Sequence, residues 1–269
     1  MLSIIICFCD KDFHYLNNLL KEIKRKVLIK YEIILIDNRI NNKEILDLDK
    51  SIKIIRSEIN KTQFFRYNKK VLDLVKGERI WYIDVDDSIE AIDKEFEKYL
   101  YYDEDIIVFS SRVVCRKKEE DNRYSLHAKW LKAETCRKNF KDFPEEATII
   151  FSEDVIALLT FKNQKKYKVD KIIYNYHLDN SENYGSKTIY NLETFERCVG
   201  VGLPYYEKVL KNNEENLINI FYNIYIYIYL YFDDKKIYYK KIAENFSREI
   251  LIKFFKKYPY YLFSFMGLF

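Results

Sequence analysis

The sequence contains few of the residues that interrupt or join folded units. It has three prolines and five glycines in 269 residues, so no stretch has the composition of a flexible linker. Hydrophobic residues make up 48% of the chain, which is enough to build a sizeable core and excludes a disordered or fibrous protein. The length suits one large domain, or one domain with an extension.

Long apolar segments and paired cysteines are also missing. No run of about 20 apolar residues occurs, so we expect no membrane-spanning helix. The start of the chain, Met1–Ile6, lacks the basic lead and the small-residue cleavage site of a signal peptide. The five cysteines include no pair with zinc-ribbon spacing, and Cys7 and Cys9 fall in an apolar run. These absences favour a reduced, cytoplasmic compartment.

Neither sign of charge dominates. The chain has 46 Lys and Arg against 42 Asp and Glu, and its net charge of +4 gives no reason to expect a nucleic-acid partner. Aromatic residues are plentiful at 17%, with 25 tyrosines. An AT-rich genome and a functional demand explain this abundance equally well.

The first hundred residues alternate short apolar runs with amphipathic stretches. Four runs predict buried strands, and they are Leu2–Phe8, Glu32–Ile36, Lys53–Arg56 and Arg79–Ile83. Apolar residues at helical spacing predict helices over Tyr15–Lys26 and Phe64–Val75. Strands that alternate with helices predict an α/β fold with a mostly parallel sheet covered on both faces.

The rest of the chain is less regular. We predict strands over Asp105–Ser111, Val113–Arg116 and Lys168–Tyr176, a charged turn or loop over Lys117–Asn122, and a short helix over Glu153–Phe161. From Ile189 onward the pattern is mainly helical. The predicted organisation is therefore a domain over residues 1–188 and a helical C-terminal extension over residues 189–269.

Polar residues follow three of the predicted strands. They are Cys9 and Asp10, Asp37, and the run Asp84, Val85, Asp86 and Asp87, which we call the acidic run. Because ligands bind beyond the carboxyl ends of parallel strands, we expect these residues to gather at one edge of the sheet. Clustered carboxylates repel one another unless a cation compensates, and Mg²⁺ or Mn²⁺ often joins carboxylates to phosphates. The acidic run is a candidate metal site, and a solvated turn capping the next helix is the alternative.

Several segments resemble glycosyltransferase family 2. Gly77–Asp87 resembles the Gly-Glu-Tyr strand and Asp-x-Asp-Asp signature of that family, Glu32–Asn38 resembles its second strand, and Ser3–Asp10 its opening strand. The resemblance covers residues 1–185. It implies a GT-A fold, which is a Rossmann-like nucleotide-sugar-binding fold with a mixed, mostly parallel sheet and flanking helices.

The resemblance also implies roles for single residues. The nucleotide-sugar-binding positions are Cys9, Asp10, Asp37, Arg66, Asn68, Asp84 and Val85. Among these, Asp37 would contact the nucleobase and Asp84 the ribose side. The metal, Mn²⁺ or Mg²⁺, would be held by Asp86 with Asp87 in support. His177, in the segment Ile173–His177, is either a further metal ligand, a diphosphate contact or an ordinary residue.

A further match is the acidic pair Glu153 and Asp154, after Phe151 and Ser152. By resemblance, Asp154 is the candidate catalytic base and Glu153 supports it. A sugar hydroxyl is a weak nucleophile, so a carboxylate must take its proton during attack. Acids that favour a helix N-terminus, with Ser152 as the cap, are the alternative. Substrate specificity would lie in residues 110–151, with Arg112, Arg116, Arg123 and Trp130 as contacts.

The C-terminal third carries no catalytic signature. Lys253–Tyr261 mixes cations with aromatic rings and precedes the apolar end Leu262–Phe269. Two interpretations stay open, namely contact with a membrane surface and packing of helices on the catalytic domain or on another subunit.

Together these features predict an inverting, metal-dependent glycosyltransferase. Its donor would be a nucleotide-sugar, with UDP-sugars as first candidates, and its acceptor a glycan or lipid-linked molecule in surface polysaccharide biosynthesis. Its place would be the cytoplasm, or the inner face of the plasma membrane. The alternative is a catalytically inactive nucleotide-sugar-binding or scaffold protein, because the family's Pro-x-Tyr-Asn turn is missing and its Arg-Asn pair is loosened to Arg66 and Asn68. A nucleotidyltransferase would need a glycine-rich loop after the first strand, and Cys9–Asp12 offers none.

Overall fold

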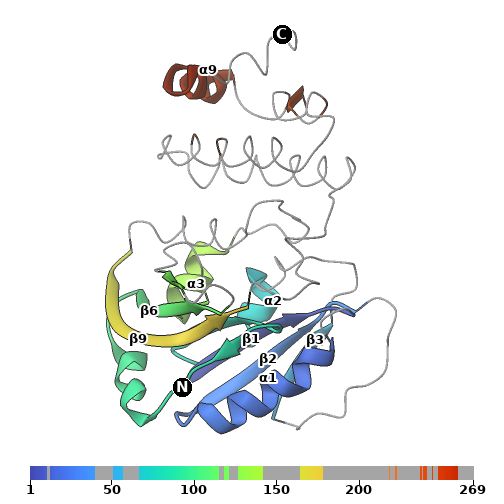
Figure 1. Ribbon diagram of the computed structural model, residues 1–269, viewed down its shortest axis with the longest axis vertical. Coiled ribbons are helices and arrows are strands. Elements are labelled where there is room, and N and C mark those ends of the chain that lie inside the picture. The colour runs from blue at the N-terminus through green and yellow to red at the C-terminus, as the bar shows by residue number, and fades with distance from the viewer. Residues whose placement is uncertain are drawn as a thin grey trace. The chain divides into compact units, whose positions relative to one another are not determined.

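The computed structural model describes the following parts of the chain: residues 1–10, 13–39, 51–56, 67–114, 118–120, 127–141, 164–177 and 248–259, with the single helical residues 218, 222, 237, 239, 240 and 244. The chain divides into two compact units. The first comprises Met1–Glu145 with Phe161–Lys187, and the second comprises Glu146–Thr160 with Thr188–Phe269. The described residues place the whole sheet in the first unit (Figure 1).

A nine-stranded sheet, counted over the described residues, forms the centre of the first unit. Its order is β3-β2-β1-β4-β8-β6-β9-β5, with β7 paired to β6. The strands are β1 Leu2–Phe8, β2 Tyr31–Asp37, β3 Lys53–Arg56, β4 Arg79–Asp84, β5 Ser88–Ile89, β6 Ile106–Val113, β7 Lys118–Glu120, β8 Lys129–Lys132 and β9 Lys166–Tyr176. The four strands β3, β2, β1 and β4 run parallel, whereas β8 is antiparallel to both β4 and β6.

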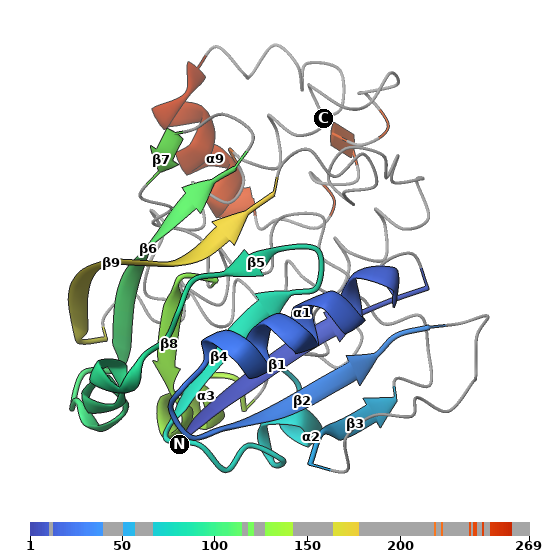
Figure 2. The same cartoon turned by 60° about the horizontal axis from the view of Figure 1, so that its bottom comes forward.

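Helices flank this sheet. They are α1 Phe13–Lys26, α2 Lys69–Leu72, the 3-10 helix η2 Lys94–Tyr101 and α3 Ala133–Asn139, whereas α9 Arg248–Lys257 belongs to the second unit. Figure 2 shows α1 lying across one face of the sheet. Its buried residues Leu16, Leu19 and Ile23 follow helical spacing and join the core formed by the apolar side chains of β1 and β4.

Gly77 allows the chain to approach the first strand closely before β4 begins. A Cβ atom at this position would lie 2.6 Å from both the Met1 carbonyl oxygen and the Ser3 Oγ. The Gly77 N–H donates to Ser3 Oγ at 2.9 Å, and that hydroxyl donates in turn to Glu32 Oε1 at 2.6 Å. Glycine is therefore the only residue that fits here without displacing the start of β1.

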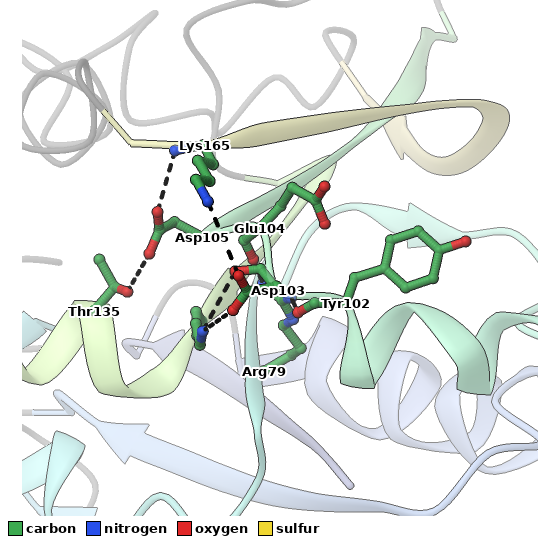
Figure 3. Close-up of polar contacts among 8 residues, drawn as sticks. Arg79, Tyr102, Asp103, Glu104, Asp105, Thr135 and Lys165 are labelled. Atoms are coloured by element: carbon green, nitrogen blue, oxygen red, sulfur yellow. Dashed lines mark hydrogen bonds and ion pairs between the residues drawn. The ribbon is translucent and has the colours of Figure 1, made fainter.

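A buried arginine fixes the beginning of β4 (Figure 3). The Arg79 guanidinium is inaccessible to solvent and donates to the carbonyl oxygens of Glu104, at 2.5 Å, and of Tyr102. Burial lowers the pKa of Arg79, and the charges of Asp105 and Glu104 oppose that shift. Asp105 also accepts from the Thr135 hydroxyl at 2.6 Å, so this cluster joins β4 to α3 and to the segment before β6.

Most of the predicted strands agree with the structure, and three predictions do not. Leu2–Phe8 and Lys53–Arg56 are strands with the predicted bounds. The helix predicted over Phe64–Val75 is only α2 in its described part, and the predicted strand Val113–Arg116 is not separate, because β6 continues to Val113. The charged loop predicted over Lys117–Asn122 contains β7, since pairing with β6 satisfies its backbone. The predicted helix Glu153–Phe161 lies outside the described residues.

Helix α9 is amphipathic. Ile250, Leu251 and Phe254 are buried, and Tyr258 stacks on Tyr222 with ring centroids 5.0 Å apart. Within the parts that the structure describes, no helix is both long and apolar enough to cross a membrane. The apolar end Leu262–Phe269 lies outside the described residues, so its role stays a prediction.

Candidate active site

The carboxyl ends of three parallel strands bring the predicted polar residues together. In the register of the sheet, Asp37 pairs with Phe8 and Asp84 pairs with Cys7, so both aspartates flank the end of β1. Cys9 and Asp10 follow that strand directly. The prediction that these residues gather at one edge of the sheet is confirmed.

Asp37 points into the protein and is held by two arginines. Its carboxylate is 1% exposed, and it accepts from the Arg39 side chain at 2.9 and 3.0 Å and from the Arg39 N–H at 3.1 Å. Arg56 donates a fourth hydrogen bond at 3.1 Å. Burial raises the pKa of Asp37, but these bonds outweigh it and hold the pKa below its ordinary value. Because a carboxylate offers about four acceptor positions, a nucleobase could reach Asp37 only if an arginine moved.

The acidic run is fixed from the side of β9. The Tyr174 hydroxyl donates to Asp87 Oδ2 and accepts from the backbone N–H of Asp84 at 3.2 Å. The backbone N–H of His177 donates to Asp87 Oδ1 at 2.8 Å. Burial, followed by the charge of Asp84, raises the pKa of Asp87 to about 8. Both oxygens of Asp87 are thus engaged by β9 and the residue after it, which holds the run in one conformation.

Asp84 faces a second partner that the sequence did not suggest. Its Oδ2 lies 2.9 Å from His127 Nε2, so a proton on that nitrogen would attract the carboxylate. The His127 ring stacks on Tyr174 with centroids 5.1 Å apart and planes 13° apart. His127 and Tyr174 together form one wall behind the acidic run.

Asp86 has a different environment. It is partly exposed, and with Asp87 and Ser88 it lines a cavity of about 510 Å³ whose other wall is α1. The α1 residues at this cavity include Tyr15, Asn18, Lys21 and Arg25. A ligand in the cavity would therefore meet Asp86 together with the polar side of α1.

Among the described residues, Asp86 is a carboxylate of the acidic run that lines the cavity and could hold a divalent cation there. Within the described ranges, no three His, Cys, Asp or Glu residues are grouped as a metal site. Mg²⁺ usually takes one or two protein carboxylates and completes its shell with water and substrate phosphates, so a single partly exposed aspartate fits. Asp87 is engaged through both oxygens, and His177 Nε2 already lies 2.8 Å from Ser88 Oγ. Ligation by Asp87 or His177 stays a prediction.

Comparison with known proteins decides the family. The model of Glycosyl transferase family 2 matches residues 3–157, which is more than half of the chain. The chain belongs to glycosyltransferase family 2. The predicted GT-A fold is thereby confirmed, and the matched residues contain the whole acidic run. No curated protein sequence matches the chain.

Solved structures of S. aureus TarS share the fold of this family 2 glycosyltransferase. TarS 1-349 is 15% identical with a TM-score of 0.55, and the match covers 99% of this chain and 75% of that one. TarS 1-349 in complex with UDP-GlcNAc is 16% identical with a TM-score of 0.56, over 99% of this chain and 76% of that one. A complex of the same protein with UDP has the same TM-score at 15% identity, over 97% and 74%.

The structure describes only some of the other residues predicted to form the site of this glycosyltransferase. Arg66, Glu153 and Asp154 lie outside the described residues, as do Arg116 and Arg123. Arg112 is partly exposed and lies 3.6 Å from Glu90. The prediction that Trp130 contacts a substrate is wrong, because its side chain is fully buried in β8 against Phe109 and Trp81.

Asn68 has a structural role that the family resemblance did not imply. It is buried and caps α2, and its Oδ1 accepts from the Lys70 N–H at 2.7 Å. We expect Asn68→Ala to lower the free energy of unfolding by about 1 kcal/mol, the usual cost of losing such a cap. Urea unfolding of Asn68→Ala beside Asn68→Asp, which keeps a capping oxygen, measures this. Equal losses in both variants would contradict the capping role.

Proposed function

We propose that this chain is an inverting, metal-dependent hexosyltransferase in surface polysaccharide biosynthesis. Its donor is a UDP-sugar, and its acceptor is a glycan or lipid-linked molecule. One observation carries the proposal: the acidic run is fixed at the carboxyl end of β4, where Asp86 opens onto a cavity. The binding of UDP and UDP-GlcNAc by TarS, which shares the fold, supports the choice of donor.

Each residue of the site has a separate role in the proposed transfer. Asp86 would hold Mn²⁺ or Mg²⁺, and the bound ion would neutralise charge on the diphosphate leaving group. Asp84 orients the ribose side of the donor, and Asp87 keeps the run rigid through Tyr174 and His177. Asp154 takes the proton of the acceptor hydroxyl as it attacks from the face opposite the diphosphate, so the anomeric configuration inverts.

Release of UDP from donor sugars tests the reaction class. We expect the purified chain to hydrolyse one member of a UDP-sugar panel slowly in the presence of Mn²⁺. A chelator should lower the rate at least tenfold, and added Mn²⁺ should restore it, because charge on the leaving group would otherwise be uncompensated. GDP-sugars and CDP-sugars serve as controls. Turnover that is indifferent to the chelator would contradict metal dependence.

The second candidate is a nucleotide-sugar-binding protein without catalysis. The missing Pro-x-Tyr-Asn turn favours it, as does the buried position of Asn68, whose side chain is engaged as the cap of α2. Titration calorimetry with UDP separates the two candidates. Binding without turnover over a panel of glycan and lipid-linked acceptors would favour the second.

The cellular setting is part of the proposal. We place the enzyme in the cytoplasm, where nucleotide-sugars are the donors, with no nucleic-acid partner. Its C-terminal segment either contacts the inner face of the plasma membrane or packs on protein, including a second copy through the C-terminal helices.

A further inference from the structure

A buried histidine stands behind the acidic run without belonging to it. His127 precedes β8 and is 6% exposed. Its carbonyl oxygen accepts from the Trp81 indole N–H at 2.6 Å, and the next carbonyl, of Ala128, accepts from the Phe109 N–H at 2.8 Å. These two hydrogen bonds join the backbone at His127 to both β4 and β6, so the position from which the ring extends is fixed.

The ring of His127 contacts Asp84, a member of the acidic run, and Tyr174, which holds that run in place. One edge places Nε2 2.9 Å from Asp84 Oδ2, and one face stacks on Tyr174. Tyr174 in turn joins the backbone of Asp84 to the carboxyl group of Asp87. A change at His127 would therefore reach both Asp84 and Asp87.

Repulsion between the carboxylates of the acidic run means that Asp84 needs a partner to keep its orientation. Asp84 and Asp86 lie two residues apart, and like charges at this range repel. An unsupported Asp84 carboxylate would gain hydration by turning toward solvent. A nitrogen atom of His127 beside Asp84 Oδ2 favours the inward orientation instead.

We propose that His127 is a positioning residue for donor binding, which holds the Asp84 carboxylate in the orientation that the nucleotide-sugar meets. This inference rests on the proposed function, because it assigns Asp84 to the donor. His127 acts through Asp84 and does not touch the substrate itself. The ring also supports Tyr174, and so keeps Asp87 in place.

Donor kinetics of two variants test the role. His127→Phe keeps a ring that can stack on Tyr174 but removes Nε2, and we expect it to raise KM for the donor about tenfold, the effect of one lost polar contact to a charged group. The kcat should change less than about threefold, because an orientation made before the chemical step affects ground state and transition state alike. His127→Gln keeps an N–H at similar reach and should recover most of the affinity. A purely structural role would instead lower the melting temperature and kcat with KM unchanged, and that result would overturn the proposal.

The contact between His127 and Asp84 can also be tested without an activity measurement. The chain has three histidines, so the ¹⁵N signals of their rings can be assigned with single variants. We expect Asp84→Asn to shift the ring nitrogens of His127 and to leave those of the exposed His14 unchanged; an unshifted His127 would overturn the contact. If the protein binds UDP without turnover, the dissociation constant replaces KM and only the proposed catalysis fails. If it binds no nucleotide, both proposals fail.

Discussion

Replacing Asp86 with alanine should lower metal-dependent release of UDP on the order of 10³-fold, the scale seen when a group that stabilises developing charge is removed. Asp86 is the member of the acidic run that is partly exposed at the cavity, whereas Asp87 is engaged by Tyr174 and His177. The fold should survive, because a side chain at a solvent-filled cavity supports little packing. A coupled assay of UDP release at saturating donor and Mn²⁺ measures the loss.

Two controls make the Asp86 result interpretable. Glu97→Ala removes an exposed carboxylate from η2, outside the residues that line the cavity, and should leave the rate unchanged. Asp86→Asn keeps the size of the side chain but weakens its hold on a cation, so it should resemble alanine more than wild type. An Asp86→Ala protein that retains metal-dependent turnover would remove the acidic run from the mechanism.

Replacing Arg79 with methionine should cost about 3–5 kcal/mol of unfolding free energy, the range found when one partner of a buried charged contact is removed. The variant loses the donors to the Glu104 and Tyr102 carbonyls, and it removes the positive charge that faces Asp105 at the start of β4. Figure 3 shows Arg79 beside the backbone of Tyr102 and the Asp105 carboxylate bonded to Thr135 and to the Lys165 N–H.

Urea unfolding checks the Arg79 prediction, provided that the slope of free energy against urea stays constant. Arg25→Met is the matched control, since Arg25 is exposed on α1 and should change the stability by less than about 0.5 kcal/mol. Equal stabilities of the two variants would mean that the buried guanidinium contributes nothing net to the fold.

Strands β1 and β4 were predictable because continuous apolar runs signal their burial, whereas β3 is partly exposed and has only two apolar residues. Leu2–Phe8 and Lys53–Arg56 have the predicted bounds, and the acidic run follows β4 as expected. Helix α2 was overestimated because apolar spacing over Phe64–Val75 does not fix where a helix ends. Strand β7 consists of charged residues, so only its pairing with β6 identifies it.

The supports of the site were not predictable from local sequence. His127 and Tyr174 reach the acidic run because β8 lies next to β4 and β9 lies next to β5. These pairings join residues far apart in the chain, and no spacing rule signals them. The two arginines on Asp37 were missed for a different reason, because the strand end indicated a ligand contact and gave no sign that Arg39 would fold back onto it.

The central position of β1 also has a consequence for the newly made chain. Its register pairs Leu2 with Arg79, so the strand stays without one of its two neighbours until β4 has been synthesised. During that interval the apolar segment Leu2–Phe8 has the features of an aggregation-prone sequence, with high β-propensity and no charge. Slow translation or a weakened β4 would prolong that exposure, and the yield of soluble protein would then depend on how quickly the sheet closes around its first strand.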